Sequence, residues 1–484
     1  MTSFWVVAAA LLILRVFALV ASPADLGPDE AQYWFWSRDP AFGYFSKPPM
    51  IAWVIGVTTG LFGNAEWAVR LGAPLLHTGT GVFLYLTARR LFTQRTAFWV
   101  GLAWLTIPGV TLSSFLMTTD ALLLFFWSGA LFFLFRLVLA QTPKLFDFTG
   151  LGAAIGFGLL SKYAMIYFPV ALILATGAIP GVRKALLRPA LILTAAIATL
   201  LVIPNILWNA GNDFQTVAHT AANANWGASL FRPDNLFAFI FEQFAIAGPV
   251  FFGVFLWSNY RRWRDANAAS PDDTTINTLT LLAFTPLAIV CVQAFISRAH
   301  ANWAVAAYPA IIILTVTWLH QRYAAWVVKA TVGVHAALAL AFALALSHFS
   351  IVDRLGLASA VKEIRGWEEQ SHAVAAMAKG YDAVMIDDRA LMGAMLYYER
   401  EMQLEIVAID PNASISHHYE AFKAFDPEIQ KRVLFVTTRD DAAHVDYRFR
   451  QIEPLGPVSA RLGPGLTRTY HLFDVSEYFG RGAQ

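Results

Sequence analysis

The chain has 484 residues, of which 57% are hydrophobic and 14% are charged. This composition is too apolar for a soluble domain of that length, so most of the chain must lie in lipid. The formal net charge of +2 argues against nucleic acid as a partner, because such binding needs a concentrated basic patch. The single cysteine, Cys291, excludes an intramolecular disulfide and a CxxC metal or redox site. We therefore interpret the sequence as a polytopic α-helical membrane protein.

The first apolar segment, residues 2–20, lacks the basic start of a cleavable signal peptide, and we expect it to form the first spanning helix. Windows of about 19 residues predict about eleven spans along the chain. Their expected bounds are 4–22, 71–88, 97–113, 120–139, 148–161, 163–180, 190–207, 237–257, 276–296, 303–319 and 325–347.

The basic residues between these spans predict which side each loop faces. They fall in three loops, at Arg89, Arg90 and Arg95, at Arg183, Lys184 and Arg188, and at Arg261, Arg262 and Arg264. If the amino terminus is cytoplasmic, all three loops are cytoplasmic too, as the positive-inside rule requires. The remaining polar candidates then lie in loops on the outer side, and an odd number of spans also sends the carboxy-terminal residues there.

The composition becomes charged and polar after about Phe349. The short apolar runs in this part are YDAVMIDD, LEIVAID and RVLFVTT, and a helix-like ALMGAMLYYER lies between the first two. This order predicts a small α/β domain. We therefore expect a transmembrane domain over residues 1–348 and an extracytoplasmic α/β domain over residues 349–484.

The first outer loop carries an acidic pair, Asp29 and Glu30, beside the membrane. Charge next to a bilayer is costly and tends to be kept for chemistry. One carboxylate could act as a general base on a hydroxyl while the other positions it or binds a cation. The alternative is a short helix that begins at Pro28, because carboxylates complement the positive end of the helix dipole.

Lys47 stands in the same loop before Pro48 and Pro49, which impose an extended backbone at the foot of the next segment. A compact ammonium binds phosphate well, and the phosphate of a prenyl lipid lies at this depth. The alternative is a lysine that snorkels to the membrane surface.

Three further positions on the outer side are candidates for binding or catalysis. Asp120 stands at the mouth of a strongly apolar segment, where it either caps a helix or takes part in catalysis. Lys162 interrupts a long apolar run, and an intramembrane lysine predicts an anionic partner. Arg298 and His300 form a second cationic group, so these residues together predict a site for a phosphate leaving group.

Aromatic and amide side chains in the outer loops suit a sugar, on which they can stack and to which they can donate hydrogen bonds. The candidates are Tyr33, Tyr44, Tyr163, Trp208, Asn209, Asn302 and Trp303. The alternative is that such loop residues satisfy their own backbone. The sequence has no nucleophile elbow, Walker loop, GxGxxG or zinc-ligand spacing.

The order of these motifs resembles the bacterial glycosyltransferases of the GT-C fold, which include dolichyl-phosphate-mannose protein mannosyltransferases and lipid A aminoarabinose transferases. The matching motifs are DEAQYW, GYFSKPP, NAEWAVRL, TTDALLLFFW, GLLSKY, PNILWNAGNDF and HANWAVAAYP. The resemblance covers residues 4–320, and its most specific parts are the acidic pair and the lysine before the double proline.

The resemblance implies transfer of a sugar from a polyprenyl-phosphate donor, with inversion, on the periplasmic face of the inner membrane. The acceptor would be lipid A, another glycan or a protein. By position, Asp29 would be the base or the carboxylate that orients the acceptor, and Lys47 would be a ligand of the donor phosphate. Asp120 would match the family's second outer acidic position, and His300 the histidine of the late outer loop. Aminoarabinose transferases tend to have a glutamate where this chain has Ser46, which puts a divalent cation in doubt.

Two other functions fit a polytopic chain with polar outer loops. A transporter or flippase for a lipid-linked sugar usually has internal repeats and polar residues at the bilayer midplane. Here no repeat is visible and the charges lie at one rim, which favours an enzyme. An assembly subunit with a degenerate site is the third interpretation, and it predicts that loss of Asp29 leaves sugar transfer intact.

Overall fold

The computed structural model describes residues 3–225, 230–265, 273–322, 324–402, 405–409 and 415–480. The chain divides into two compact units. The first, which we call the membrane unit, comprises Met1–Val20, Lys47–Val54 and Arg70–Ala343. The second, which we call the C-terminal unit, comprises Ala21–Ser46, Ile55–Val69 and Leu344–Gln484. The C-terminal unit therefore includes most of the first outer loop, which the sequence had grouped with the membrane domain.

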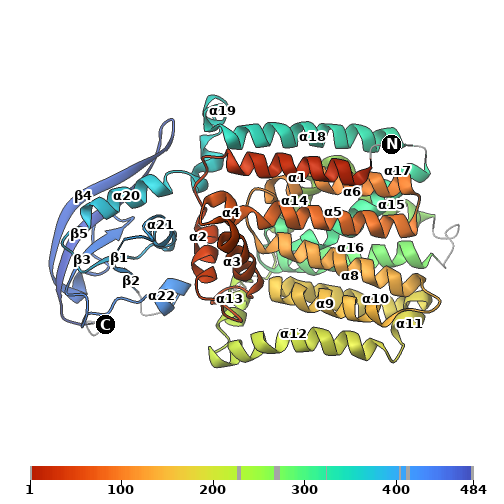
Figure 1. The fold of residues 1–484 in the computed structure, drawn as a ribbon, viewed down its shortest axis with the longest axis horizontal. Coiled ribbons are helices and arrows are strands. Elements are labelled where there is room, and N and C mark those ends of the chain that lie inside the picture. The colour runs from red at the N-terminus through yellow and green to blue at the C-terminus, as the bar shows by residue number, and fades with distance from the viewer. Residues whose placement is uncertain are drawn as a thin grey trace. The chain divides into compact units, whose positions relative to one another are not determined.

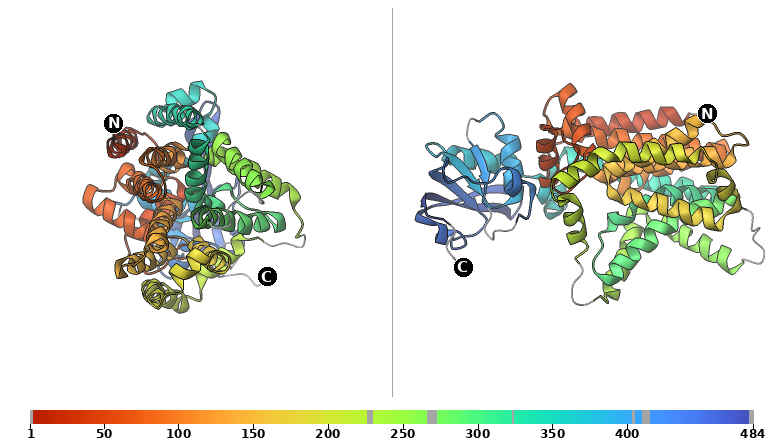
Figure 2. Two further views of the ribbon diagram at one scale, coloured as in Figure 1. Left: turned by 90° about the vertical axis from the view of Figure 1, so that its right-hand side faces the viewer. Right: turned by 90° about the horizontal axis from the view of Figure 1, so that it is seen from below.

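The membrane unit consists of helices that run side by side (Figures 1 and 2). They are α1 (Phe4–Val20), α5 (Gly72–Leu91), α6 (Gln94–Thr106), α7 (Pro108–Ser113), α8 (Thr119–Leu139), α9 (Leu145–Ser161), η1 (Tyr163–Ile166), α10 (Tyr167–Ala178), α11 (Pro180–Leu186), α12 (Leu191–Gly211), α13 (Gln215–Asn223), α14 (Pro233–Ala247), α15 (Pro249–Arg264), α16 (Thr274–Ile296), η2 (Ala301–Ala307), α17 (Tyr308–Gln321) and α18 (Ala325–Ser347). Two more helices, α3 (Met50–Phe62) and α4 (Glu66–Arg70), contribute residues to both units.

The predicted spans coincide with helices along most of the chain, for example at α8, α16 and α18. Among the described residues, five helical segments are long and apolar enough to cross a membrane, or up to seven if each of two bent pairs counts as one span. Shorter apolar helices are α1, α3 and α9. These findings establish a multi-pass membrane protein, and the total of eleven spans stays a prediction.

One predicted span is wrong as a continuous helix. Residues 237–257 form parts of α14 and α15, which meet at an angle of 116° between Ala247 and Pro249. Pro249 has no N–H to continue the hydrogen-bond ladder of α14, so a new helix begins there. The sequence window detected the apolar composition but not the change of direction.

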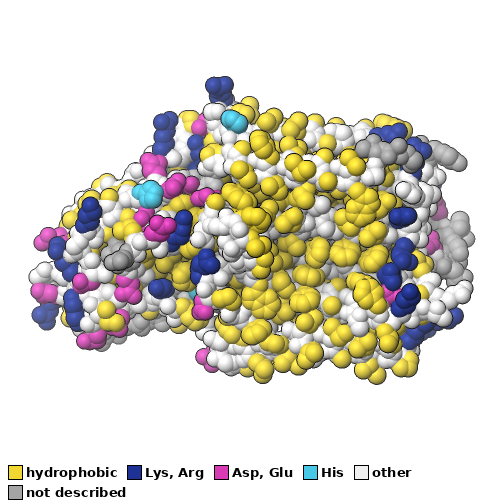
Figure 3. Space-filling model, in the orientation of Figure 1, with side chains coloured by type: hydrophobic (Ala, Val, Ile, Leu, Met, Phe, Trp, Pro, Cys, Tyr) yellow, Lys and Arg dark blue, Asp and Glu magenta, His cyan; other side chains and the backbone are white. Residues whose placement is uncertain are grey.

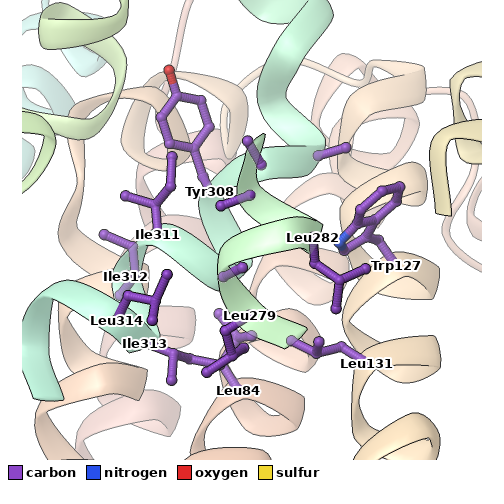
Figure 4. Packing of buried hydrophobic residues seen from close by; sticks show 14 of the residues in the cluster. Leu84, Trp127, Leu131, Leu279, Leu282, Tyr308, Ile311, Ile312, Ile313 and Leu314 are labelled. Carbon is purple, nitrogen blue, oxygen red and sulfur yellow. The ribbon is translucent and has the colours of Figure 1, made fainter. Parts of the chain in front are cut away.

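The core of the membrane unit is built around α17. Its residues Ile311, Ile312 and Ile313 are 0% exposed, and they lie among leucines of α5, α8 and α16 (Figure 4). A helix that is apolar on every side belongs inside a bundle. Other helices expose apolar side chains, as expected for a lipid-facing surface, and basic side chains gather at the end of the bundle where α11 lies (Figure 3).

The C-terminal unit contains a mixed sheet and the helices packed on it. Its helices are α2 (Pro28–Ser37), α19 (Phe349–Arg354), η3 (Ala358–Ile364), α20 (Trp367–Met377), α21 (Arg389–Tyr398), α22 (His418–Phe422) and η4 (Asp446–Arg448). Its strands are β1 (Ala383–Ile386), β2 (Glu405–Ala408), β3 (Arg432–Thr437), β4 (Phe449–Gly463) and β5 (Leu466–Tyr478), in the sheet order β2-β1-β3-β5-β4. The strands β1, β2 and β3 are parallel, whereas β5 is antiparallel to β3 and β4. The predicted α/β domain is therefore confirmed.

Helices α9 and α12 approach closely where α9 has two glycines four residues apart, Gly152 and Gly156. A Cβ added at Gly152 would lie 2.5 Å from the carbonyl oxygen of Thr194 on α12. Small residues at this spacing let two helix backbones pack closely in a membrane. We expect Gly152→Ala to push α12 away and to lower the melting temperature of the protein in detergent.

Gly177 of α10 is a matched control, because a Cβ added there would meet nothing within 4 Å. In a helix, alanine is favoured over glycine by roughly 0.5–1 kcal/mol, so Gly177→Ala should be neutral or stabilising. Equal melting temperatures for Gly152→Ala and Gly177→Ala would contradict the close packing of α9 and α12.

Candidate active site

A partly buried ion pair lies at the start of α8. The Nζ atom of Lys162 donates to Oδ1 of Asp120 at 2.6 Å, and Nδ2 of Asn302 donates to Oδ2 at 2.7 Å. The Asp120 side chain is 10% exposed and that of Lys162 22%. Both carboxylate oxygens are therefore engaged, so Asp120 holds a lysine and an amide in place, and a catalytic role for Asp120 stays a prediction. The side chain of Thr118 makes no capping hydrogen bond to α8, and Asp120 lies in the first turn of this helix.

The same carboxylate lines a cavity of about 530 Å³ in the membrane unit. His300 and Asn302, two more of the predicted site residues, line it as well. Asp120 comes from α8, His300 immediately precedes η2 and Asn302 lies within η2, about 180 positions from Asp120 in the chain. The structure therefore brings an acidic, a basic and an amide side chain to one cavity, as the outer-side clustering predicted.

Tyr163 and Asn209 belong to a second polar group that links η1 to α12. The hydroxyl of Tyr163 donates to Oδ1 of Asn205 at 3.0 Å and accepts from Nδ2 of Asn209 at 3.2 Å. Asn205 and Asn209 are 2% and 3% exposed. The side chains thus bond one another in the present conformation, and binding of a substrate by Tyr163 or Asn209 stays a prediction.

The remaining candidates of the membrane unit differ in exposure. Arg298 is exposed, and His300 is exposed beside Trp303, whose ring centre lies 5.4 Å away. Lys47 and Trp208 are half-buried. Neither lines the cavity that contains Asp120.

The acidic pair belongs to the C-terminal unit, where it starts α2. The helix opens at Pro28, and Oε2 of Glu30 accepts from the backbone N–H of Gly27 at 3.1 Å, so Glu30 closes a capping box. Asp29 faces outward with a side chain that is 64% exposed, and its Oδ1 accepts from both Nη atoms of Arg389 at 2.9 Å. The helix-start interpretation thus describes Glu30, whereas Asp29 presents its carboxylate on the surface.

Tyr33 and Tyr44 are both 5% exposed and pack around Trp36 in the same unit. The hydroxyl of Tyr44 donates to a backbone oxygen of Trp36 at 3.0 Å and accepts from the N–H of Ala41 at 3.0 Å. Burial raises the pKa of Tyr44 to about 12. These contacts fold the loop, and a role in binding substrate stays a prediction for both tyrosines.

Sequence reasoning missed several residues that line the cavity. Glu242 of α14 is a carboxylate within a predicted span, and the rule that singled out Lys162 also applies to it. His77, whose Nε2 lies 2.9 Å from Oγ of Ser113, also lines the cavity, but a histidine inside a helix gives no comparable signal. Arg389 does not line this cavity but contacts Asp29 in the C-terminal unit. It was missed because it is far from the first outer loop in sequence.

The described residues do not fit a metal site of the kind in doubt at Ser46. Across the described ranges, no group of three or more His, Cys, Asp or Glu side chains could hold a metal ion.

The fold is that of a membrane glycosyltransferase of the GT-C class. Over 97% of both chains the structure matches ArnT from Cupriavidus metallidurans with a TM-score of 0.65, at 19% sequence identity. It also matches ArnT from the same organism bound to undecaprenyl phosphate, with a TM-score of 0.65, 18% identity and 98% of both chains covered. At such low identities these matches define the fold alone.

The sequence comparisons identify the family within this fold class. The family described as dolichyl-phosphate-mannose-protein mannosyltransferase matches residues 46–208. The lipid A galacturonosyltransferase RgtD of Rhizobium johnstonii is 34% identical over 430 residues, which are 87% of this chain and 88% of RgtD. The lipopolysaccharide core galacturonosyltransferase RgtB of that organism is 31% identical over 216 residues, 44% of each chain. The chain therefore belongs to the family of GT-C glycosyltransferases that includes RgtD, and it is an enzyme rather than a transporter.

The Asp120–Lys162 pair can be tested by a double-mutant cycle. Removal of one partner leaves the other charge unpaired in a largely apolar setting, which costs on the order of 3 kcal/mol. We expect Asp120→Ala and Lys162→Met each to lower the melting temperature in detergent. The double variant should lose clearly less than the sum of the two single losses, whereas additive losses would show that the pair does not form.

Proposed function

We propose that the protein transfers a galacturonic acid residue, or a closely related uronic acid, from a polyprenyl-phosphate donor to lipid A. The transfer takes place on the periplasmic face of the inner membrane. The observation that carries this proposal is 34% identity to a lipid A galacturonosyltransferase over 87% of the chain. The core of lipopolysaccharide is the second acceptor considered, because two shorter matches are core galacturonosyltransferases.

The cations of the membrane unit have the chemistry to bind the donor phosphate. As the sugar leaves, the phosphate keeps its negative charge, so it needs fixed positive groups more than a proton. The candidates are Lys47, Lys162, Arg298 and His300. The cavity supports this role for two of the four. His300 lines the cavity together with Asp120, and the Lys162 ammonium is hydrogen-bonded to the Asp120 carboxylate.

Within the acidic pair, Asp29 is the better candidate for the base. Glu30 is 4% exposed and bonds the start of its own helix. Asp29 is exposed, and in the described residues its Oδ2 receives no hydrogen bond, so this oxygen can accept the proton of an acceptor hydroxyl. Asp120 then has a supporting role, since both of its oxygens already hold other side chains.

Sugar contacts are proposed for the aromatic and amide candidates. These are Tyr33, Tyr44, Tyr163, Trp208, Asn209, Asn302 and Trp303. Asn302 has the best support, because it lines the cavity and is exposed. A uronic acid also carries a carboxylate, for which the exposed Arg298 and His300 have the complementary charge.

Mass spectrometry of lipid A tests the proposed reaction in cells. Deletion of the gene should remove one uronic acid from lipid A, and a plasmid copy of the natural gene should restore it. Asp29→Asn should fail to restore it, because loss of a general base lowers turnover by about 10² or more. Asp39→Asn is the control, since Asp39 is an exposed acid of the same loop.

Two results of this experiment would reject the proposal. An unchanged lipid A after gene deletion would exclude lipid A as the acceptor. Full restoration by Asp29→Asn would remove Asp29 as the base and would favour the interpretation in which the acidic pair only starts a helix.

Lys47 can be tested with the purified enzyme and free polyprenyl phosphate as an inhibitor. If Lys47 contacts the phosphate, Lys47→Ala removes a charge-assisted hydrogen bond worth roughly 1.5–3 kcal/mol, which is about tenfold or more in affinity. Lys47→Arg should restore only part of this, because its planar fork does not replace a compact ammonium. Lys184→Ala, on an exposed lysine of α11, should change nothing. Equal inhibition constants for all four proteins would identify Lys47 as a lipid anchor.

A further inference from the structure

Helix α2 is an integral part of the C-terminal unit and packs against α21. The contact is close at Gly393, where an added Cβ would lie 3.4 Å from Cβ of Ala31 and 3.6 Å from the carbonyl oxygen of Pro28. Phe35 packs on the apolar core of the unit, and its ring centre lies 5.7 Å from that of Tyr419. Helix α2, which carries Asp29, thus packs against the rest of the C-terminal unit through apolar side chains.

The chain before α2 is tied to the same unit by hydrogen bonds. The N–H of Trp367 donates to Oδ2 of Asp25 at 2.7 Å, and the N–H of Leu26 donates to the hydroxyl of Tyr398 at 2.9 Å. In addition, the N–H of Asp25 donates to the carbonyl of Ile364 at 3.0 Å. The chain immediately before Gly27 is therefore fixed to the rest of the C-terminal unit.

Arg389 is the first residue of α21 and follows strand β1 after two aspartates. The second of these, Asp388, caps α21 by accepting from the N–H of Leu391 at 2.8 Å, and it also accepts from the hydroxyl of Tyr470 at 2.7 Å. The strand β1 lies between β2 and β3, and α21 leads from β1 to β2. Ligands of such sheets bind outside the carboxyl ends of the strands, which is where Arg389 begins its helix.

The guanidinium of Arg389 contacts two side chains of α2. Its Nη1 and Nη2 each donate to Oδ1 of Asp29 at 2.9 Å, and Nη1 also donates to Oε1 of Gln32 at 3.0 Å. Because the guanidinium is planar and its donors are fixed relative to one another, these contacts restrict the rotation of the Asp29 side chain. They hold one oxygen of the carboxylate and leave the other oxygen, Oδ2, available.

We propose that Arg389 is a positioning residue that orients the catalytic carboxylate of Asp29. The C-terminal unit then supplies both the packing surface for α2 and the group that orients the base. This proposal rests on the proposed function, in which Asp29 accepts the proton of the acceptor hydroxyl. Arg389 itself neither accepts nor donates a proton in the reaction.

A purely structural ion pair predicts a different pattern of effects. The side chains of Arg389 and Asp29 are 38% and 64% exposed, and exposed ion pairs contribute little to stability. Loss of the pair should therefore leave the fold intact. A positioning role predicts instead that turnover falls, because a small displacement of a catalytic group can cost up to about 10²-fold.

The test uses purified full-length enzyme with a synthetic polyprenyl-phosphate uronic acid and lipid A. We expect Arg389→Ala to lower kcat by roughly tenfold to a hundredfold while the KM for the donor stays unchanged. Arg389→Lys should recover only part of the loss, and added guanidinium ion should partly rescue Arg389→Ala. The matched control is Arg432→Ala, which removes an exposed arginine from another Arg–Asp pair of the same unit, with Asp474.

The double variant Asp29→Asn with Arg389→Ala separates the two hypotheses. If Arg389 acts through Asp29, the double variant is no slower than Asp29→Asn alone. Multiplied losses, normal turnover of Arg389→Ala, or rescue of Asp29→Asn by guanidinium would each overturn the positioning role while Asp29 remains the base. Near-normal turnover of Asp29→Asn would instead reject the base and, with it, the premise of the proposal.

Discussion

The cost of an unpaired charge beside hydrocarbon governs the organisation of the membrane unit. Lys162 is held between apolar segments only together with Asp120, which also binds Asn302. The cavity that Asp120 lines is mostly apolar, and Asp120, Glu242, His300 and Asn302 are polar side chains at its wall.

In the C-terminal unit, three carboxylates of the first outer loop differ in their exposure and in their hydrogen-bond partners. Asp29 is exposed and held by an arginine, Glu30 is buried at the start of its helix, and Asp25 is bonded to the N–H of Trp367. Burial raises the pKa of Asp25 to about 6. In the part of the chain that the structure describes, Asp29 has one oxygen held by Arg389 and a second, Oδ2, that receives no hydrogen bond.

Much of this organisation could be predicted from the sequence. Hydropathy located most of the helices, and the alternation of apolar runs with a helical pattern predicted β1, α21, β2 and β3 in order. Local composition could not predict the bend at Pro249 or the hairpin of β4 and β5, whose alternating polar and apolar residues form a less distinct signal. The predicted outer-side cluster was found in part, since Asp120, Lys162, His300 and Asn302 meet at or next to one cavity.

The main gap concerns contacts between residues far apart in the chain. Asp29 and Arg389 are 360 positions apart, and no local pattern in either segment indicates the other. For the same reason, the sequence assigned the first loop to the membrane domain, although it folds with the sheet. Glu242 is a different case, because its place inside an apolar span was a visible signal.

Reconstitution of the purified protein in liposomes that contain a polyprenyl-phosphate uronic acid and lipid A tests the central claim most directly. The account predicts that one polyprenyl phosphate is released for each uronic acid joined to lipid A, with no other protein present. Movement of the donor across the bilayer without formation of a new glycosidic bond would contradict it.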